Sequence, residues 1–318
     1  MSSLQNDILC LLTKGVQENI FGLERRVVRP FCVKIPRPGE QKVKFREMGD
    51  TIKIKGFILE GYVESEYSND YIEIAWSQEC YLKIPMSFLL AYKITVLSDN
   101  KIFIELPHNY LLDNAEIPLI ALPFYEFEIN IHSNSKYRNY EIYAVIDRSV
   151  YDVNERKELT QGKTHYIRQI QPFTLSKNIS LNDSNKFSEM LTSVGLLCQG
   201  IFVKNNKNNI KSIIVNAIQK SNKEDKPNTN IEILNYDRNL LTIYGEQISD
   251  ELTYFSFNSL ERFGSENMVG SFNFSRVEMC EVKIELINTE NNNRCEVFFV
   301  NWNHMKYTGG LCGITFGF

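Results

Sequence analysis

Histidine, cysteine and carboxylate side chains build metal sites and hydrolytic centres only at particular spacings, and this chain has none of those spacings. The four histidines are His108, His132, His165 and His304. They form no H-x-x-x-H or H-E-x-x-H set, and no Cys/His cluster is spaced for zinc. The sequence also lacks G-x-S-x-G, a Walker loop and G-x-G-x-x-G. We therefore predict no catalytic, cofactor-binding or metal-binding residue, and a protein that is not an enzyme.

Two further patterns resemble chemistry at first sight. Glu126 and Glu128 stand two apart on a strand-like run, so they would share a face, as a glycosidase pair requires. A solvated sheet face gives the same spacing, and we adopt that interpretation. The glycine run Gly309–Gly313 lacks the following helix that a phosphate cradle needs.

The cysteines are odd in number and scattered, and no two form a C-x-x-C pair. The seven are Cys10, Cys32, Cys80, Cys198, Cys280, Cys295 and Cys312. This usage favours reduced and mostly buried thiols in an intracellular protein.

Three N-x-S/T sequons begin at Asn178, Asn182 and Asn273. The first two lie in a polar stretch that we predict to be an exposed loop. Asn273 lies in the closing segment of the chain, where we expect it to be buried. Chance explains all three, and the sequence does not indicate whether any is glycosylated.

Composition limits the possible partners. The 318 residues are 43% hydrophobic and 12% aromatic, which is typical of a globular protein with a sizeable core. The net charge is −4, whereas broad binding to a phosphate backbone needs a surplus of Lys and Arg. We predict no specific nucleic-acid partner. The first residues lack a convincing secretory signal, and no run is long and apolar enough to span a bilayer.

Short alternating runs rich in Val, Ile, Phe and Tyr dominate the chain from Phe31 onward. The predicted strands are Thr51–Leu59, Tyr71–Trp76, Lys101–Leu106, Tyr125–Ile131, Asn139–Asp147 and Thr164–Phe173. Only Asn154–Leu159, after Asp152, indicates a helical turn in mid-chain. Strand-length segments without long amphipathic helices predict an all-β protein of two stacked sandwiches.

The last part of the chain is the most distinctive. Strand-like runs at Val277–Ile287 and Cys295–Asn303 flank a polar hairpin, and an apolar ending with several glycines follows. That ending has too many glycines for a helix and too many apolar residues for a free tail, so we expect it to pack into a β core. The pattern GS-x-NFSR … NWN … GG-L-x-G resembles the carboxyl terminus of double jelly-roll major capsid proteins of nucleocytoplasmic large DNA viruses, of iridovirus and phycodnavirus type.

Other segments resemble the same family in the same order. They are Leu11–Gly22, Tyr71–Trp76, Lys101–Ile131, Tyr140–Gln171 and Phe187–Val203. Within the fourth segment, the residues that fall on the family pattern are Glu155, Arg156, Gln161, His165, Tyr166, Ile167, Gln169 and Gln171. We interpret Glu155-Arg156 and His165-Tyr166 as a polar set that ties the interdomain link to the second sandwich. The chain resembles a short member of the family, with the missing length mainly between Ser77 and Ser87.

The resemblance implies a fold of two tandem eight-stranded jelly-roll β-sandwiches. We expect an amino-terminal arm at residues 1–30, a first jelly roll at 31–138 and a second at 139–318. It also implies a capsid structural protein of the virion, assembled in the host cytoplasm. Its homotrimers would be pseudo-hexagonal capsomers that tile an icosahedral shell, and it would need no cofactor.

The partners implied are the chain itself, neighbouring capsomers, minor capsid proteins and an internal membrane layer. Two alternatives stay open. One is a minor capsid or scaffold paralogue of the same fold, and the other is a β-sandwich carbohydrate-binding module.

Overall fold

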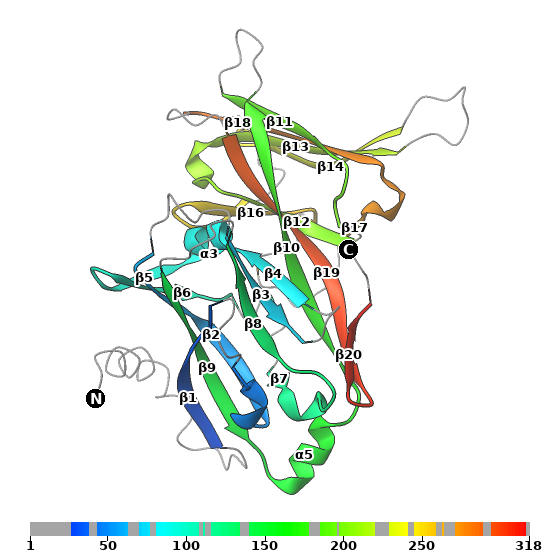
Figure 1. Cartoon of the computed structure of the whole chain (residues 1–318). Coiled ribbons are helices and arrows are strands. Elements are labelled where there is room, and N and C mark those ends of the chain that lie inside the picture. Colours follow the sequence, from blue (N-terminus) through cyan, green and yellow to red (C-terminus); the bar gives the residue numbers. More distant parts are fainter. Residues whose placement is uncertain are drawn as a thin grey trace. The chain divides into compact units, whose positions relative to one another are not determined.

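The computed structural model is built almost entirely of β-strands (Figure 1). It describes residues 27–37, 43–62, 70–76, 81–107, 111, 116–133, 140–177, 185–195, 197–219, 229–240, 245–258, 263, 271–288 and 294–315. The expected arm at 1–30 lies almost wholly outside the described residues, as do Cys10, Cys80, His108, Asn178 and Asn182. The chain forms two compact units, which are described separately.

The first unit contains two antiparallel sheets. Its strands are β1 (Val27–Lys34), β2 (Thr51–Glu60), β3 (Tyr71–Ala75), β4 (Tyr81–Pro85), β5 (Ile94–Ser98), β6 (Lys101–Glu105), β7 (Ile117–Pro118), β8 (Glu128–His132) and β9 (Glu141–Val150). One sheet has the order β1-β9-β2-β6-β5, with β7 beside β2, and the other has the order β4-β3-β8. Alternate side chains of both sheets, such as Ile52 and Ile54 of β2 and Ile72 and Ile74 of β3, are fully buried. This alternation is the burial pattern of two sheets that share a core.

The first unit also contains short helices. They are α3 (Met86–Tyr92), α5 (Val153–Leu159), η2 (Phe45–Glu47) and η3 (Leu119–Ala121). All residues of α3 but Tyr92 are buried, whereas α5 has no buried residue. The predicted turn after Asp152 is thus confirmed as α5. The predicted strand at Tyr125–Ile131 starts later, at Glu128, because residues 123–125 form a turn.

The second unit holds one long sheet path. Its strands are β10 (Lys163–Lys177), β11 (Lys186–Leu191), β12 (Leu197–Val203), β13 (Ile210–Gln219), β14 (Thr229–Asp237), β15 (Gly245–Ser249), β16 (Leu252–Ser256), β17 (Phe272–Asn273), β18 (Met279–Leu286) and β19 (Arg294–Thr308). The order is β14-β13-β18-β11-β10-β19-β12-β16-β15, and β17 pairs with β12. Short 3-10 turns, η4 (Lys207–Asn209) and η5 (Phe274–Arg276), interrupt the loops.

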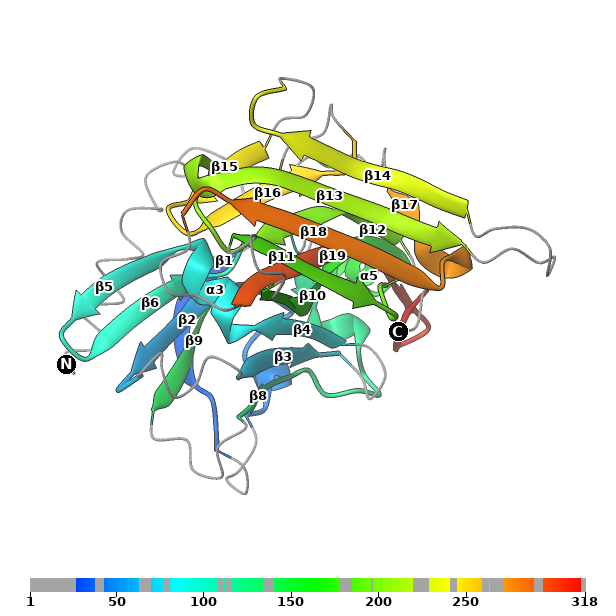
Figure 2. The same cartoon turned by 90° about the horizontal axis from the view of Figure 1, so that it is seen from above.

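This path bends around a single core. Tyr236 of β14 lies 4.8 Å from Phe255 of β16, centroid to centroid, although six strands separate β14 and β16 in the path. Buried side chains of β13, β18, β12 and β19, including Ile213, Val282 and Val297, belong to the same apolar cluster. Figure 2 shows β13, β14 and β18 as one layer of this unit. The unit is therefore a sandwich, as the alternating sequence pattern predicts.

The boundary between the units differs from the expected division at residue 138. Strand β9, which that division assigns to the second jelly roll, pairs with β1 and β2 in the first sheet. Residues of β10 up to His165, and Met305–Thr315, also belong to the first unit. Residue 138 falls between β8 and β9, which both belong to the first unit.

The glycine-rich ending forms a hairpin. Gly309 and Gly310 have φ values of 60° and 82°, which allow the tight turn between β19 and β20 (Leu311–Ile314). Only Cys312 of β20 is buried, at 8% exposure, while Leu311 is 50% exposed. The ending thus joins a sheet as expected, but most of its residues are not buried. Asn273 is also exposed, contrary to expectation, because β17 ends there and its side chain accepts a bond from the Ser275 N–H.

Gly56 provides a test of the packing in the first sheet. It lies at a bulge of β2, and a Cβ at this position would overlap the carbonyl oxygen of Ile104 and the Phe103 ring. We expect Gly56→Ala to lower the free energy of unfolding by about 2 kcal/mol, measured by urea denaturation. Gly313→Ala is the matched control, because nothing lies within 4 Å of its added Cβ and its φ is not positive. Equal stability of the two variants would contradict the packing described here.

Candidate functional site

Two of the sequence motifs meet in the second unit. Strands β10 and β19 are neighbours in the sheet, and they carry the residues 168–171 and the Asn-Trp-Asn motif at 301–303. The Asn303 amide donates to the Gln169 Oε1 at 3.0 Å, and the Asn301 amide donates to the Gln171 Oε1 at 3.1 Å. We call these two amide pairs, together with Arg168, Trp302 and Gln199, the polar seam.

Arg168 is the centre of the polar seam. It is 1% exposed, its Nε donates to the Gln199 Oε1 at 2.8 Å, and its guanidinium carbon lies 4.5 Å from the centre of the Trp302 ring. The ring of Tyr166 packs edge-on against Trp302, with the two ring centroids 5.1 Å apart. A buried guanidinium needs both hydrogen bonds and a polarisable surface, and Gln199 and Trp302 provide them.

The polar seam extends into a loop. Gln171 donates to the Ser193 carbonyl at 2.5 Å and accepts from the Gly195 N–H at 2.9 Å. Its side chain therefore holds the loop between β11 and β12 as well as Asn301. Because the Asn303–Gln169 pair is buried and joins groups that would be costly to bury alone, the polar seam fixes the register of β10 against β19. It contains no nucleophile and no carboxylate pair, so its chemistry is structural.

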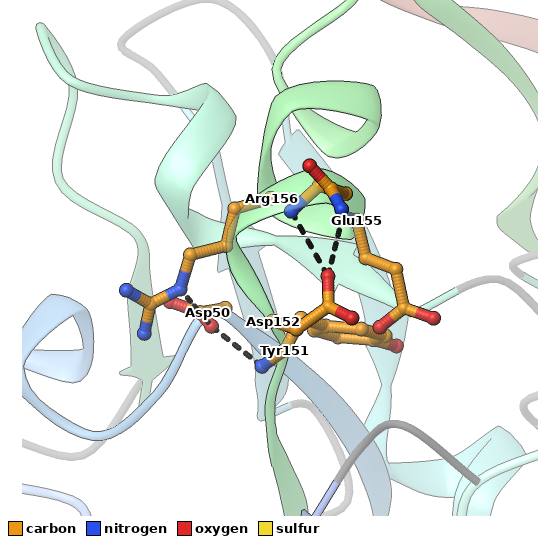
Figure 3. Close-up of polar contacts among 6 residues, drawn as sticks. Asp50, Tyr151, Asp152, Glu155 and Arg156 are labelled. Carbon is orange, nitrogen blue, oxygen red and sulfur yellow. Dashed lines mark hydrogen bonds and ion pairs between the residues drawn. The ribbon is translucent and has the colours of Figure 1, made fainter. Parts of the chain in front are cut away.

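A second polar network, in the first unit, holds α5 (Figure 3). Asp50, whose side chain is 9% exposed, accepts at Oδ2 from the Tyr151 N–H and from the Arg156 Nε, both at 2.8 Å. At the start of the helix, Asp152 accepts from the N–H groups of residues 154 and 155 at 2.9 Å, which makes it an N-cap. With no apolar side chain buried, α5 depends on this cap and this ion pair for its position.

These contacts correct the expected role of the polar set. Arg156 contacts Asp50 of the first unit, so Glu155-Arg156 does not tie the link to the second sandwich. His165 packs edge-on against Tyr307, at 5.5 Å, within the first unit, and Tyr166 packs against Trp302 and His304 within the second. The four residues belong to separate clusters. Asp50 and Gln199 were not predicted, because Asp50 lies outside the segments that resemble the family and Gln199 was not singled out within Phe187–Val203.

The remaining candidates form no reactive centre. Glu126 is exposed and precedes β8, while Glu128 accepts from the Asn130 amide at 3.3 Å, so the two are not neighbours on one strand. His132 stacks on Tyr71 at 4.5 Å and lies 3.4 Å from Glu73. Among the residues described, no group of three or more His, Cys, Asp or Glu is placed to hold a metal ion. Over the same residues, no helix is both long and apolar enough to cross a bilayer.

The cysteines that the structure describes are free thiols in apolar surroundings. Cys198, Cys280, Cys295 and Cys312 are buried, and Cys32 is partly buried. Burial raises the pKa of Cys32 to about 11, and it raises the pKa values of Cys280 and Cys295 to about 12. The prediction of mostly buried cysteines is confirmed for these five.

Several large apolar side chains are exposed on the surface of the described residues. Phe124 is 72% exposed, Val96 is 73% exposed and Val153 is 67% exposed. Leu240, in the second unit, is 59% exposed. Exposed apolar residues at this level are common singly, but they are also where protein–protein contacts form. Surfaces of this kind are the candidate functional sites in the part of the chain that the structure describes.

The fold of this chain is also found in solved structures. The chain is similar to VP54 of PBCV-1, whose crystal structure was fitted into a cryo-EM reconstruction of the virophage Sputnik. The two chains are 12% identical and superpose with a TM-score of 0.61. The match covers 93% of this chain and 98% of that chain. It is similar to a chain of the quasi-atomic model of the PBCV-1 virus capsid, with 11% identity and a TM-score of 0.57 over 92% of this chain and 97% of the other. No protein-family model and no curated sequence matches the chain. The comparison confirms the all-β fold of two jelly rolls that the sequence predicts.

The polar seam gives a sharp prediction. Arg168→Lys keeps the charge but loses the Nε bond to Gln199 and the flat contact with Trp302, so we expect the free energy of unfolding to fall by roughly 2–3 kcal/mol. Arg238→Lys is the control, because Arg238 is exposed and its Nη1 donates to the Asn208 carbonyl. Its effect should stay within about 0.5 kcal/mol. If Arg168→Lys is equally mild in urea denaturation, the polar seam does not stabilise the fold.

Thiol reactivity provides a pH-dependent test. Raising the pKa of Cys32 by burial, from 9.0 to about 11, leaves about 100-fold less thiolate at pH 8 than an unperturbed thiol has. We expect iodoacetamide to label Cys32 slowly in the native protein and rapidly in urea, with the native rate rising up to about pH 11. Peptide mapping by mass spectrometry would measure both rates. Equal native and denatured rates at pH 8 would contradict the burial described here.

Proposed function

We propose that this protein is a viral capsid structural protein. The observation that carries the proposal is the match in fold over nearly the whole length of both chains, including a chain of the PBCV-1 virus capsid. The sequence segments that resemble the capsid family in the same order also support it. They include residues of the polar seam and of the α5 network. Two sandwiches whose described residues form no group placed to hold a metal ion are suited to a structural building block.

The subunit would assemble first as a homotrimer. Two jelly rolls in each of three chains give a capsomer with six similar sides, and such a pseudo-hexagonal block tiles an icosahedral shell through repeated lateral contacts. Closed symmetry limits growth of the capsomer itself, while the lateral contacts extend the lattice. Both sandwiches have the buried apolar core that such a block requires.

The partners follow from this assembly. Each capsomer would contact neighbouring capsomers of the same chain, and the shell would contact minor capsid proteins and an internal membrane layer. The protein would be located in the virion after assembly in the host cell cytoplasm. The net charge of −4 supports contacts with protein in preference to nucleic acid.

Solution mass tests the proposal. By light scattering coupled to size exclusion, we expect a stable species near three times 37.0 kDa whose mass does not change on dilution. A monomer of 37.0 kDa under all conditions would contradict self-assembly and favour a minor component that requires a partner.

A thermal-shift measurement with oligosaccharides distinguishes a carbohydrate-binding module from a capsid protein. Binding to the native state would raise the melting temperature, as a carbohydrate-binding module requires. For a capsid protein we expect no shift together with a stable trimer.

A further inference from the structure

The second half of β2 is apolar on both faces of its sheet. Phe57, Ile58 and Leu59 are consecutive and fully buried, whereas successive residues of a strand point to opposite faces. Phe57 and Leu59 are opposite buried core residues of β9. Ile58 therefore lies on the other face, because the bulge of β2 between Ile54 and Gly56 reverses the alternation.

Ile58 is the centre of a small apolar cluster on that face. It is opposite Tyr143 of β9 and Phe103 of β6, and opposite residues share a face. Val145 of β9 is the other buried member. The side chains packed against these two are only partly buried, and they are Cys32, Leu97, Phe103 and Tyr143. We call these six residues the outer cluster.

Ion pairs border the outer cluster. Lys34 pairs with Glu141 at 2.9 Å, and Lys55 pairs with Asp147 at the same distance. An apolar centre inside a polar rim is the usual composition of a contact surface. The partly buried members leave apolar area that a covering segment would remove from water.

The segment before β1 carries apolar residues that also need cover. Residues 1–26 lie outside the described residues, and their sequence has Leu4, Ile8, Leu11 and Leu12 at the i, i+4, i+7 and i+8 spacing of one helical face. We call these four residues the apolar stripe. So short an amphipathic run is not stable as an isolated helix in water, so it needs an apolar surface to pack on.

The chain joins the apolar stripe directly to the sheet that carries the outer cluster. Val27 begins β1, and Cys32 of the same strand belongs to the cluster. The roughly 15 residues between Leu12 and Val27 reach about 50 Å when extended. The cluster ends at Leu97 of β5, four strands from β1 and therefore about 19 Å away (Figure 2). The stripe can reach every residue of the outer cluster.

We propose that residues 1–26 fold back over this face of the sheet, so that the apolar stripe packs on the outer cluster. Each apolar surface then covers the other, whereas a partner protein on the outer cluster would leave the stripe exposed. Attachment through β1 gives the stripe a high effective concentration at the cluster. The contact lies within a single chain, and it goes beyond the proposed capsid function because it does not require assembly.

Cross-linking tests the position of the segment. In a Cys10→Ser background, position 11 lies on the apolar stripe and position 6 lies on the opposite side of a helix. We expect Leu11→Cys to form a disulfide with the native Cys32 about 10-fold faster than Asn6→Cys under mild oxidation, measured by peptide mapping. Equal rates, or no link to Cys32 from position 11, would overturn the inference.

The mass of the linked species identifies the chain that supplies the segment. A link within one chain runs at 37.0 kDa on a denaturing, non-reducing gel, and a link between two copies runs at twice that mass. We expect the first result at every protein concentration. A link mainly between two copies would overturn docking within one chain.

Charge placed on the apolar stripe should uncover Cys32. We expect Ile8→Asp with Leu11→Asp to raise the rate of Cys32 alkylation by iodoacetamide about fivefold at pH 8, because burying a carboxylate on the cluster is unfavourable. Asn6→Asp with Thr13→Asp is the matched control, since it adds the same charge away from the stripe.

A second thiol separates release of the segment from unfolding. Cys295 is buried in the core of the second unit, so its slow alkylation should be unchanged in both double variants. Equal rates of Cys32 alkylation in the stripe variant and its control would contradict the inference. The solution mass of the wild-type protein does not depend on this contact, so the inference and the proposed function can fail separately.

Discussion

The second unit depends on one constraint, which is that a buried arginine must have its hydrogen bonds satisfied. Arg168 is almost wholly buried, and its guanidinium would be very unfavourable there without Gln199 and the face of Trp302. Those partners are available only when β10 lies beside β19 in one register. A slip by one residue would turn Arg168 to the other face and would break both amide pairs. The polar seam therefore selects one pairing from several that the apolar pattern alone would allow.

The same reasoning explains why the recognisable motifs are structural. Gln169, Gln171, Asn301 and Asn303 are amides, which bond strongly to each other but do not act as acids, bases or nucleophiles at neutral pH. In the first unit, Asp50 and Arg156 have a similar role, since they hold a helix that buries nothing. Interactions that specify geometry without performing chemistry suit the building block that we propose.

The strands and the fold class could be predicted from the sequence because alternation with period two is a local signal. Thr51–Leu59 and Lys101–Leu106 correspond to β2 and β6 to within a residue at the end. The helix α3 was not predicted, since its run Met86–Tyr92 is apolar throughout and starts after Pro85 without a polar cap. The strand β5 was not predicted either. Its burial pattern does not alternate, because β5 lies at the edge of its sheet and most of its residues are exposed.

The contact partners of the candidate residues could not be predicted from the sequence, because they are distant along the chain. Arg156 lies 106 residues from Asp50, and Gln169 lies 134 residues from Asn303, so their contacts exist only through the strand order. The motif pattern located Gln169 and Arg156 but assigned Arg156 to the wrong contact. The unit boundary was misplaced because β9, which follows residue 138, pairs with β1 and β2 of the first sheet.

Cryo-electron microscopy of single particles of the purified protein tests the central claim most directly. If the chain is a capsid building block, class averages will show a threefold-symmetric particle with a six-sided outline, and each side will match one jelly roll. Particles that contain a single chain, or that have only twofold symmetry, would contradict the claim.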